Sequence, residues 1–380
     1  MKRFLLIAGK VVFFNAFFNS VVVLKYLLVV MIIVKPKIQA VGTAVPHFAL
    51  GQHEIKEFVA AMFRSHVDHI DKLLPIFENS YIKVRYLSRP LEWYAAPHSF
   101  SEANQIFEEV ALELSEKAAL QAMTKAGVNP LDIGMVIFVT STGIATPTLD
   151  SKLIQRLNLS PHTGRLPIWG LGCGGGAAGI ARASELAYRI PGKSILLVAV
   201  ELCSLTFQKN DCSKANIVGT SIFADGAAAV LLTMDDEGPS ILGSYSTLFP
   251  NSEDIMGWEL IETGLKVRFS RDIPSIVRRY LPDLLDNACE KWGIERSQIA
   301  HYVVHPGGAK VLNAYSDSLN LAMDQLSQAR GVLIDYGNMS SASILFVLER
   351  FMAQIPRRDE YGIMLALGPG FSAEQVLFRW

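Results

Sequence analysis

Residues 169–179 read Trp169-Gly170-Leu171-Gly172-Cys173-Gly174-Gly175-Gly176-Ala177-Ala178-Gly179, a single cysteine among glycines and alanines. An apolar run precedes this stretch, and a run with helical spacing follows it at 180–190. We therefore expect the cysteine at a helix N-terminus, where free N–H groups and the helix dipole favour negative charge. Such a position lowers a thiol pKa from about 8.5 to roughly 3.5–7.5. From this stretch alone two interpretations remain open: a nucleophile at neutral pH, or a buried and inert cysteine.

The second half of the chain repeats the plan of the first. Cys173 precedes a helical run that ends at Pro191, and Asn338 precedes one that ends at Pro356. Both pairs share an offset of 165 positions, because 338 − 173 and 356 − 191 are equal. The short apolar runs that follow the two helices are residues 194–200 and 361–367. This long-range repeat indicates two copies of one structural unit.

We therefore expect an α/β fold of two halves, 38–235 and 236–380, with helices packed on buried, mixed but mostly parallel sheets. Pseudo-twofold packing of the halves brings the matching helix starts together, so that Cys173 faces Asn338. His305, at the end of a second-half strand, then points into the same space. Alone, His305 fits a core histidine bonded to backbone, and Asn338 fits a helix cap. Together with Cys173 and the repeat, they favour a catalytic site.

The composition narrows the function classes. The 380 residues are 50% hydrophobic and 19% charged, which is enough apolar material for a large core. The net charge of −1 provides no general field that would attract nucleic acid. The four cysteines form no CxxC pair, so we expect neither a zinc site nor a disulfide framework. A reducing, cytoplasmic location is the prediction that follows.

Residues 1–37 form a hydrophobic N-terminal extension. Within it, residues 11–34 are almost wholly apolar and have lysines on both sides. This pattern is typical of a membrane span or anchor, which would associate the protein with a membrane. No small-residue cleavage site follows, so a signal peptide is disfavoured. We favour the other interpretation, a non-native start with Met31 as the true first residue, because residues 38–43 then read as the first strand.

Several motifs accompany Cys173, His305 and Asn338. They are Trp93-Tyr94, Pro97-His98-Ser99-Phe100, Gly172-Cys173, Phe223-Ala224-Asp225-Gly226-Ala227-Ala228-Ala229, His305-Pro306-Gly307-Gly308, Tyr336-Gly337-Asn338-Met339-Ser340-Ser341-Ala342 and Gly368-Pro369-Gly370. With these motifs, residues 38–380 resemble the type III polyketide synthases, the chalcone-synthase-like branch of the thiolase fold. The resemblance implies αβαβα layers and a homodimer. It also implies acyl-CoA and malonyl-CoA as substrates, with no cofactor and no metal.

The resemblance also implies a role for each of the three residues. Cys173, as a thiolate paired with His305, would attack an acyl-CoA thioester and hold the acyl chain. Decarboxylation of malonyl-CoA would then place negative charge on its thioester oxygen. His305 and the Asn338 amide would be the two donors that stabilise this enolate. The carbanion would attack the acyl-Cys173 thioester, and the chain would close into a ring after a few cycles.

The sequence departs from the plant enzymes of this family at the cavity. Phe223 matches the gatekeeper phenylalanine, but Val267 stands in place of a second one. Cys203 replaces a threonine, and Thr146 replaces a methionine that reaches into the partner subunit. Dense cores do not leave such freed volume empty without cost. We interpret it as room for a long fatty acyl-CoA starter, which resembles bacterial alkylpyrone and alkylresorcinol synthases; the alternative is that neighbouring side chains refill the space.

The CoA contacts are less well marked. Lys72 keeps one of three basic positions near the tunnel mouth, and Lys310 and Gly308, beside His305, are further candidates for phosphate contact. Ser340 is a candidate cavity hydroxyl for ring closure. Two rival functions remain: a ketoacyl-synthase-like enzyme that uses a carrier protein, and a membrane-anchored binding protein without activity. The length of the starter, the number of extensions, the extender and the mode of ring closure are not readable from the sequence.

Overall fold

The computed structural model describes residues 4–7, 10–13, 34–67, 69–234, 237–354 and 359–380. The chain divides into two compact units, Met1–Lys35 and Pro36–Trp380. In the first unit, β1 (Phe4–Ile7) and β2 (Lys10–Phe13) pair as an antiparallel hairpin. The predicted anchor or non-native start at 11–34 lies, for residues 14–33, outside the described residues. No helix in the described part of the chain is long and apolar enough to cross a membrane.

A nine-stranded mixed sheet organises the second unit, in the order β13-β14-β15-β10-β3-β9-β8-β6-β7. Its strands are β3 (Lys37–Ala44), β6 (Ile133–Thr140), β7 (Gly164–Trp169), β8 (Ser194–Leu202), β9 (Asp225–Thr233), β10 (Ser240–Leu248), β13 (Ile299–Val304), β14 (Tyr361–Gly368) and β15 (Ser372–Arg379). Every residue of β8 and of β9 is buried. These two strands read as nearly continuous apolar runs because helices cover both of their faces.

The sheet contains the predicted duplication. In the first half, β3 is antiparallel to β9, β9 is antiparallel to β8, and β8 is parallel to β6. In the second half, β10, β15, β14 and β13 follow one another with the same directions. The halves join where β3 meets β10, through the pair Lys37 and Ser240. The prediction of an α/β fold built from two halves of one topology is confirmed. The expectation of mostly parallel strands was wrong: in this sheet only β13–β14, β8–β6 and β6–β7 pair in parallel, because β9 and β15 return antiparallel beside β8 and β14.

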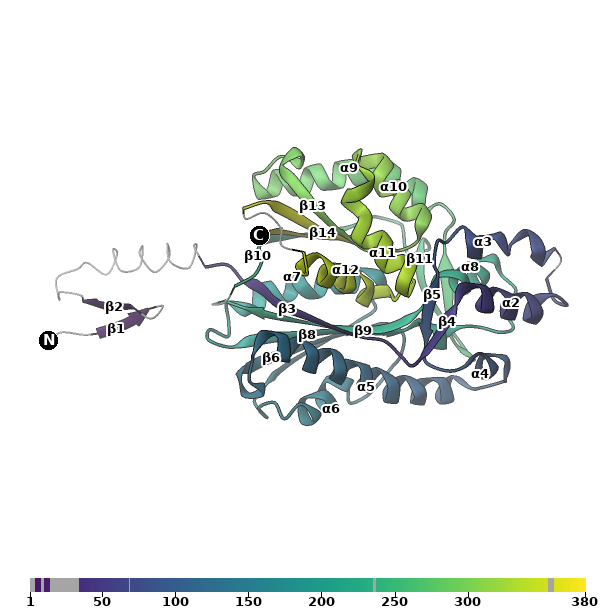
Figure 1. Ribbon diagram of the computed structural model, residues 1–380, viewed down its shortest axis with the longest axis horizontal. Helices are drawn as coiled ribbons and strands as arrows, with labels where there is room; N and C mark the ends of the chain where they lie inside the picture. The colour runs from purple at the N-terminus through teal and green to yellow at the C-terminus, as the bar shows by residue number, and fades with distance from the viewer. Residues whose placement is uncertain (1–3, 8–9, 14–33, 68, 235–236, 355–358) are drawn as a thin grey trace. The chain divides into compact units, whose positions relative to one another are not determined.

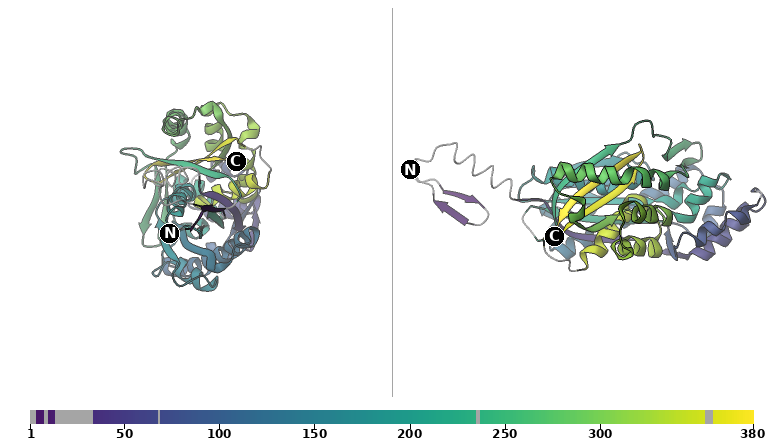
Figure 2. Two further views of the ribbon diagram at one scale, coloured as in Figure 1. Left: turned by 90° about the vertical axis from the view of Figure 1, so that its left-hand side faces the viewer. Right: turned by 90° about the horizontal axis from the view of Figure 1, so that it is seen from above.

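The helices cover the sheet in layers, visible from top to bottom in Figure 1 and from two other sides in Figure 2. The outer helices of the first half are α5 (Phe100–Ala126) and α6 (Leu149–Arg156); those of the second are α9 (Ile273–Trp292) and α10 (Ala309–Leu319). Between the halves lie α7 (Gly175–Ala187) and α12 (Ser343–Met352), which contact strands of both halves and each other. A Cβ on Gly176 would lie 2.3 Å from the Ser341 carbonyl oxygen, so this close approach requires glycine.

Smaller elements cluster around α8 (Lys214–Ile222), at the right of Figure 1. They are β4 (Phe48–Gly51), α2 (Gln52–Phe63), α3 (Pro75–Glu78), β5 (Val84–Leu87), α4 (Leu91–Ala95), β11 (Met256–Ile261) and β12 (Gly264–Phe269). Helix α11 (Ser327–Tyr336) packs instead on α12 and β5. Single 3₁₀ turns are η1 (Ile70–Lys72), η2 (Pro130–Asp132), η3 (Gly172–Gly174), η4 (Cys203–Thr206), η5 (Arg296–Gln298), η6 (Met323–Leu326) and η7 (Ser340–Ala342). Helix α8 packs against α2, α3 and β12 and leads directly to Phe223.

Candidate active site

Cys173 lies where the chain turns from β7 into α7. Gly170 and Gly172 have φ angles of 92° and 46°, which glycine adopts without strain. At Gly172 a Cβ would also lie 2.7 Å from the Pro369 ring. The 3₁₀ turn η3 then places Cys173 directly before α7, with 6% of its surface exposed. The glycines around the cysteine are therefore required by the tight turn and by the second-half loop packed against it.

Asn338 occupies the matching place in the second half. Gly337 has a φ of 74°, and η7 then leads into α12. The Asn338 side-chain oxygen accepts a hydrogen bond from the Ser340 N–H at 2.8 Å, as a local cap does. Its Nδ2 donates to the Gly307 carbonyl at 3.2 Å. An amide nitrogen has two N–H groups, so the second faces the Cys173 thiol and can turn to a substrate during the reaction.

His305 follows β13, and its backbone N–H donates to the Leu365 carbonyl at 2.9 Å. Its ring lies over Gly307, where an added Cβ would come within 3.3 Å of the ring carbon Cδ2. The side chain is buried, and neither ring nitrogen has a hydrogen-bond partner among the described residues. A structural core histidine would bond at least one nitrogen. Two free nitrogens therefore favour a histidine that binds a substrate over a purely structural one.

The two helix starts meet at Ser340. Its Oγ lies 3.5 Å from the Cys173 Sγ, and Asn338 also hydrogen-bonds the thiol. Asn338 in turn contacts Gly307, on which the His305 ring lies. A continuous set of contacts thus runs from the first-half thiol to the second-half imidazole. Ser340 adopts a φ of 46°, which is uncommon for a residue other than glycine, and this conformation belongs to the same turn.

The ionisation of the site differs from the sequence argument. Burial raises the pKa of the Cys173 thiol to about 11, against opposing hydrogen bonds from Ser340 and Asn338, and the nearby Glu201 charge adds to the rise. Burial also lowers the pKa of His305 to about 3. The prediction of a lowered thiol pKa at the helix start was wrong for the ligand-free protein, because desolvation outweighs the helix dipole. At neutral pH the site therefore holds a neutral thiol and a neutral imidazole rather than an ion pair.

Glu201, which the sequence analysis missed, lies beneath these residues in β8. It is completely buried and accepts hydrogen bonds from the Ser141 N–H, the Ser141 and Thr142 hydroxyls and, at 2.6 Å, the Ser341 hydroxyl. Burial raises its pKa. These bonds tie β8 and the loop after β6 to the second-half turn η7. The signal available in the sequence was one carboxylate at the end of an otherwise apolar strand.

The predicted cavity residues Phe223, Cys203 and Val267 pack together in one buried cluster. The Phe223 ring stacks on Phe269, with ring centroids 5.4 Å apart, and lies 6.0 Å from Trp258. Aromatic side chains from β11 and β12 thus pack on the gate beside Val267. Both interpretations of the freed volume, a tunnel and refilling by neighbours, stay predictions.

A pocket with an empty volume of about 520 Å³, its open mouth included, extends from this cluster toward α2 and α4. Most of its wall is apolar, and it includes Ile55, Leu87 and Phe207. Phe58 lines both this pocket and an outer groove of about 960 Å³, whose wall includes Met62 and Lys209. The half-buried Phe58 ring therefore separates the inner pocket from the surface.

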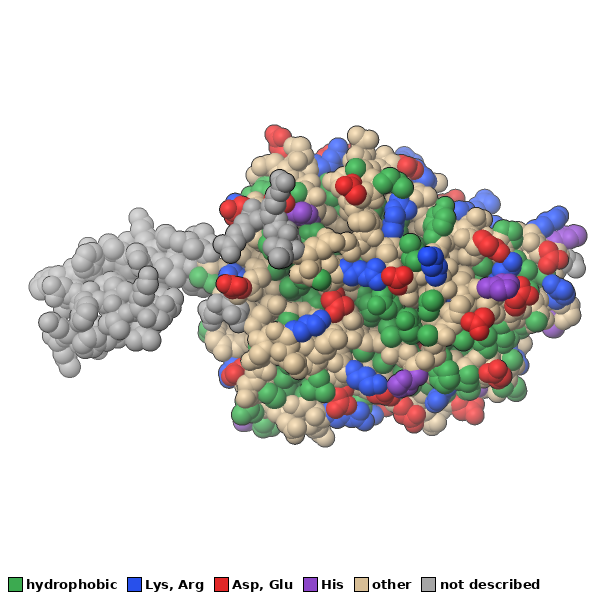
Figure 3. Space-filling view, viewed as in Figure 1, with side chains coloured by type: hydrophobic (Ala, Val, Ile, Leu, Met, Phe, Trp, Pro, Cys, Tyr) green, Lys and Arg blue, Asp and Glu red, His purple; other side chains and the backbone are tan. Residues whose placement is uncertain are grey.

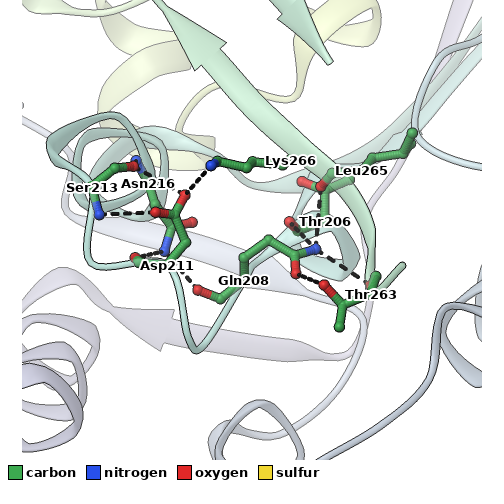
Figure 4. Close-up of polar contacts among 8 residues, drawn as sticks. All are labelled: Thr206, Gln208, Asp211, Ser213, Asn216, Thr263, Leu265 and Lys266. Atoms are coloured by element: carbon green, nitrogen blue, oxygen red, sulfur yellow. Dashed lines mark hydrogen bonds and ion pairs between the residues drawn. The ribbon is translucent and has the colours of Figure 1, made fainter. Parts of the chain in front are cut away.

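Polar contacts anchor the loop in front of α8, as Figure 4 shows. The Ser213 hydroxyl caps α8 by accepting from the Asn216 N–H, and the Asp211 carboxylate holds Ser213 and Lys266. The Gln208 side chain bonds the Thr263 hydroxyl at 2.6 Å. These contacts join the N-terminal end of α8 to the β11–β12 hairpin.

Four other predicted residues lie outside this cluster. Thr146 is exposed in the loop after β6. Lys72 and Lys310 are exposed, on η1 and on the first turn of α10, and Gly308 is the residue that caps α10 with a φ of 150°. On the face in Figure 3, acidic and basic side chains are interspersed rather than separated. Their roles at a CoA site or a subunit interface stay predictions.

A thiol, an unpartnered imidazole and a carboxamide, brought together by two duplicated α/β halves, define a condensing enzyme of the thiolase fold. The model of the N-terminal domain of chalcone and stilbene synthases matches residues 33–236, and that of the C-terminal domain matches residues 240–380. The chain therefore belongs to the chalcone and stilbene synthase family, the type III polyketide synthases.

Named relatives agree with this assignment. A Bacillus subtilis (strain 168) protein whose name places it among the chalcone synthases is 40% identical over 358 residues, covering 90% of this chain and 98% of the relative. The 1,3,6,8-tetrahydroxynaphthalene synthase of Streptomyces peucetius is 36% identical, covering 90% and 93%. The crystal structure of 1,3,6,8-tetrahydroxynaphthalene synthase from Streptomyces coelicolor superposes with a TM-score of 0.86 at 26% identity, covering 90% of this chain and 99% of that one.

Membership decides between the functions left open by the sequence. The protein is an acyl-transferring condensing enzyme that uses acyl-CoA and malonyl-CoA and needs no cofactor, as its family does. Neither a carrier-protein-dependent ketoacyl synthase nor an inactive binding protein fits the two family matches. The starter, the product and the role of each residue lie beyond this assignment.

Proposed function

We propose that the enzyme loads a long-chain fatty acyl-CoA on Cys173, extends it with malonyl-CoA and releases an alkylpyrone or alkylresorcinol. The observation that carries the catalytic part is the set of contacts from Cys173 through Ser340, Asn338 and Gly307 to an imidazole with two free nitrogens. The observation that favours a long starter is the apolar pocket beside Phe223 and Cys203.

In the loading step, neutral His305 takes the proton of the Cys173 thiol. The thiolate attacks the thioester carbon of the starter, and the bond from that carbon to the CoA sulfur breaks. The proton then passes from His305 to the departing CoA thiolate, which leaves an acyl-enzyme and a neutral imidazole. His305 can take this role because it is unprotonated at neutral pH and neither of its ring nitrogens is occupied by another hydrogen bond.

In the extension step, the carboxylate of malonyl-CoA leaves as CO₂ and its electron pair forms an enolate. The second Asn338 N–H and the N–H of neutral His305 donate hydrogen bonds to the enolate oxygen. Fixed donors aimed at developing charge are worth about 10²–10³ in rate each. The enolate carbon attacks the acyl-Cys173 carbonyl, the carbon–sulfur bond breaks, and Cys173 leaves as a thiolate. The lengthened chain is then a β-ketoacyl-CoA, whose thioester this thiolate attacks in the next cycle.

The acyl chain lies in the pocket that ends at Phe58. The cavity itself holds only about 50 Å³, below the roughly 300–1,000 Å³ usual for small-molecule sites, so a long chain requires side chains of the mostly apolar wall to move aside. Phe58 also faces the outer groove, so a chain longer than the pocket displaces this ring and continues toward the surface. Trp258 and Phe269 fill the opposite side, which directs the chain toward α2 rather than toward β12.

A starter-length profile tests this proposal. We expect wild-type enzyme to prefer lauroyl-CoA or palmitoyl-CoA over acetyl-CoA, with pyrone or resorcinol products in the mass spectrum. Cys203→Trp fills the inner end of the pocket and shifts preference to short starters, whereas Phe58→Trp reduces only the longest chains. Activity with acetyl-CoA serves as the internal control for folding. Unchanged preference in Cys203→Trp, or 1,3,6,8-tetrahydroxynaphthalene, the compound in a relative's name, as the wild-type product, would refute the long-chain starter.

We further propose that the enzyme is a homodimer, as its family generally is. Ile144 and Trp169 are large apolar side chains with 45% and 54% of their surfaces exposed. Both line a surface hollow of about 750 Å³ with an apolar wall, next to Thr146. A contiguous exposed apolar patch of this kind supports a protein interface. Trp169→Glu should convert the dimer to monomers in analytical ultracentrifugation, and a wild-type monomer would contradict the proposal.

A further inference from the structure

Helix α8 ends at Phe223, and side chains from elsewhere in the fold bind its last carbonyl groups. The final carbonyls of a helix have no partner within the helix. Here each accepts a hydrogen bond: Thr220 and Phe223 from Arg85 Nη1 at 2.5 and 2.9 Å, Ser221 from Gln52 Nε2 at 2.8 Å, and Ile222 from the Asn338 N–H at 2.8 Å. Arg85 and Gln52 thus hold the segment that carries the gate.

Arg85 itself is unusually placed for a charged residue. It lies in β5 with only 2% of its surface exposed, and its Nε donates to the Gln52 side-chain oxygen at 2.9 Å. Within the described ranges it forms no ion pair with a carboxylate. The C-terminal end of a helix carries partial negative charge, which stabilises a cation at this position. The hydrogen bonds of Arg85 thus go to the end of α8 and to Gln52, while the Asp225 carboxylate lies close enough to act on its charge without a direct contact.

The same arginine also touches the backbone beside Asn338. A Cβ on Gly337 would lie 3.0 Å from the Arg85 Cγ, so the arginine stem packs directly on this glycine. Phe223 and Asn338 pair as a parallel bridge, and the Ala224 N–H donates to the Asn338 carbonyl at 2.9 Å. The gate and the carboxamide are thus neighbours on paired backbone, and Arg85 contacts Phe223 and Gly337, the residue before Asn338.

We infer that Arg85, oriented by Gln52, is a positioning residue that fixes the Phe223 gate and the Asn338 carboxamide relative to each other for malonyl-CoA decarboxylation. The inference rests on the proposed roles of Phe223 and Asn338. Two carbonyls and the Gln52 oxygen are bound by one planar guanidinium. Lysine keeps the charge but presents a single ammonium group, which cannot reproduce this fork.

The opposite end of α8 provides a matched control. Ser213 caps the helix start and belongs to the network in Figure 4, which reaches the β11–β12 hairpin but not Asn338. Loss of such a cap removes the partner of an N–H group at the helix start and destabilises the helix. Ser213→Ala therefore weakens the same helix without touching the carbonyls at Phe223.

The test separates loading from decarboxylation. Wild type, Arg85→Lys, Gln52→Met, Ser213→Ala and Asn338→Ala are compared for the burst of acylated Cys173 and for ¹⁴CO₂ release from malonyl-CoA. Arg85→Lys and Gln52→Met should lower the kcat of CO₂ release about tenfold or more and change acylation less than about threefold. Ser213→Ala should lower the melting temperature without this split. If Arg85→Lys does not fold, Gln52→Met still tests the inference, because it removes the side-chain oxygen that orients Arg85.

A double-mutant cycle tests whether Arg85 acts through the gate. In a Phe223→Ala background, Arg85→Lys should change the kcat of CO₂ release much less than it does in wild type. Equal loss of acylation and decarboxylation, or the same pattern in Ser213→Ala, would overturn the inference. If Asn338→Ala leaves CO₂ release unchanged, the proposed role of Asn338 fails. If Asn338→Ala abolishes release and Arg85→Lys does not affect it, only the positioning role fails.

Discussion

Helices α7 and α12 begin in the same way, but the turns before them carry different functional side chains. In each half a glycine of positive φ lies at a 3₁₀ turn that leads into a buried helix. Gly172 is the first residue of η3, and Gly337 lies shortly before η7. The first half presents the thiol of Cys173, and the second presents the amide of Asn338, held by two hydrogen bonds. Duplication thus provides the geometry of the site. The residue at one position in each copy decides whether that copy supplies a nucleophile or a hydrogen-bond donor.

The strongest way to break this comparison is to remove each side chain separately. Cys173→Ala should abolish polyketide formation, with a loss of about 10⁴-fold or more, because no acyl-enzyme can form. It should still release CO₂ from malonyl-CoA, since His305 and Asn338 remain. Asn338→Ala should do the reverse: acylation of Cys173 persists, while CO₂ release falls about 10²–10³-fold. Intact-protein mass spectrometry measures the first step and ¹⁴CO₂ release the second.

Circular dichroism and thermal melting of both variants control for folding. If each substitution removed both partial reactions equally, the division of labour between the halves would be wrong, and the two helix starts would act as one unit.

A second prediction concerns the pKa of Cys173, which the helix start lowers and burial raises. A thiol of raised pKa is protonated at neutral pH, and its thiolate fraction grows as pH rises. Alkylation of Cys173 by iodoacetamide in ligand-free enzyme should therefore increase roughly tenfold per pH unit from 7 to 9 without a plateau. The exposed Cys212 is removed by Cys212→Ser so that one thiol dominates the signal. A rate that is constant above pH 7 would instead demonstrate a thiolate–imidazolium pair at rest.

The sequence was sufficient to predict those parts of the site that depend on a local motif or on the internal repeat. The spacing of Cys173 and Asn338 in matching halves was enough to bring the two residues together. The direction of the Cys173 pKa shift could not be derived in the same way, because it depends on how completely the folded protein covers the thiol. Likewise, the effect of Val267 depends on Phe269 and Trp258, which pack on Phe223 only after the β11–β12 hairpin has formed.

Residues whose partners lie far away in the sequence could not be identified from the sequence for a similar reason. Glu201 binds Ser141 and Ser341, which lie 60 and 140 positions away, and Arg85 binds the Phe223 carbonyl 138 positions away. Nothing in the neighbourhood of either residue in the sequence indicates these contacts. A buried charge in an apolar strand is a sign that such partners exist, but it does not say which residues they are.

The smallest expected effect concerns Glu201, whose carboxylate accepts hydrogen bonds from Ser141 in the first half and from Ser341 in the second. Glu201→Gln keeps the shape but turns one acceptor into an amide donor, which faces the Ser141, Thr142 or Ser341 donors. We expect a loss of about 2 kcal/mol in the free energy of unfolding, as for hydrogen bonds to charged groups. The substitution also removes a negative charge that raises the pKa of Cys173. The thiol pKa therefore falls, and alkylation at pH 8 accelerates a few-fold.

Glu349→Gln is the matched control, because this carboxylate binds Thr43 and Lys125 at the partly exposed end of α12. A surface pair of this kind contributes at most about 1 kcal/mol and is screened by solvent. Urea unfolding and alkylation rates of the two variants therefore separate a buried carboxylate that joins the halves from an ordinary surface one. If both variants alkylate at the wild-type rate, the charge of Glu201 does not reach the thiol, and the helix starts alone set its reactivity.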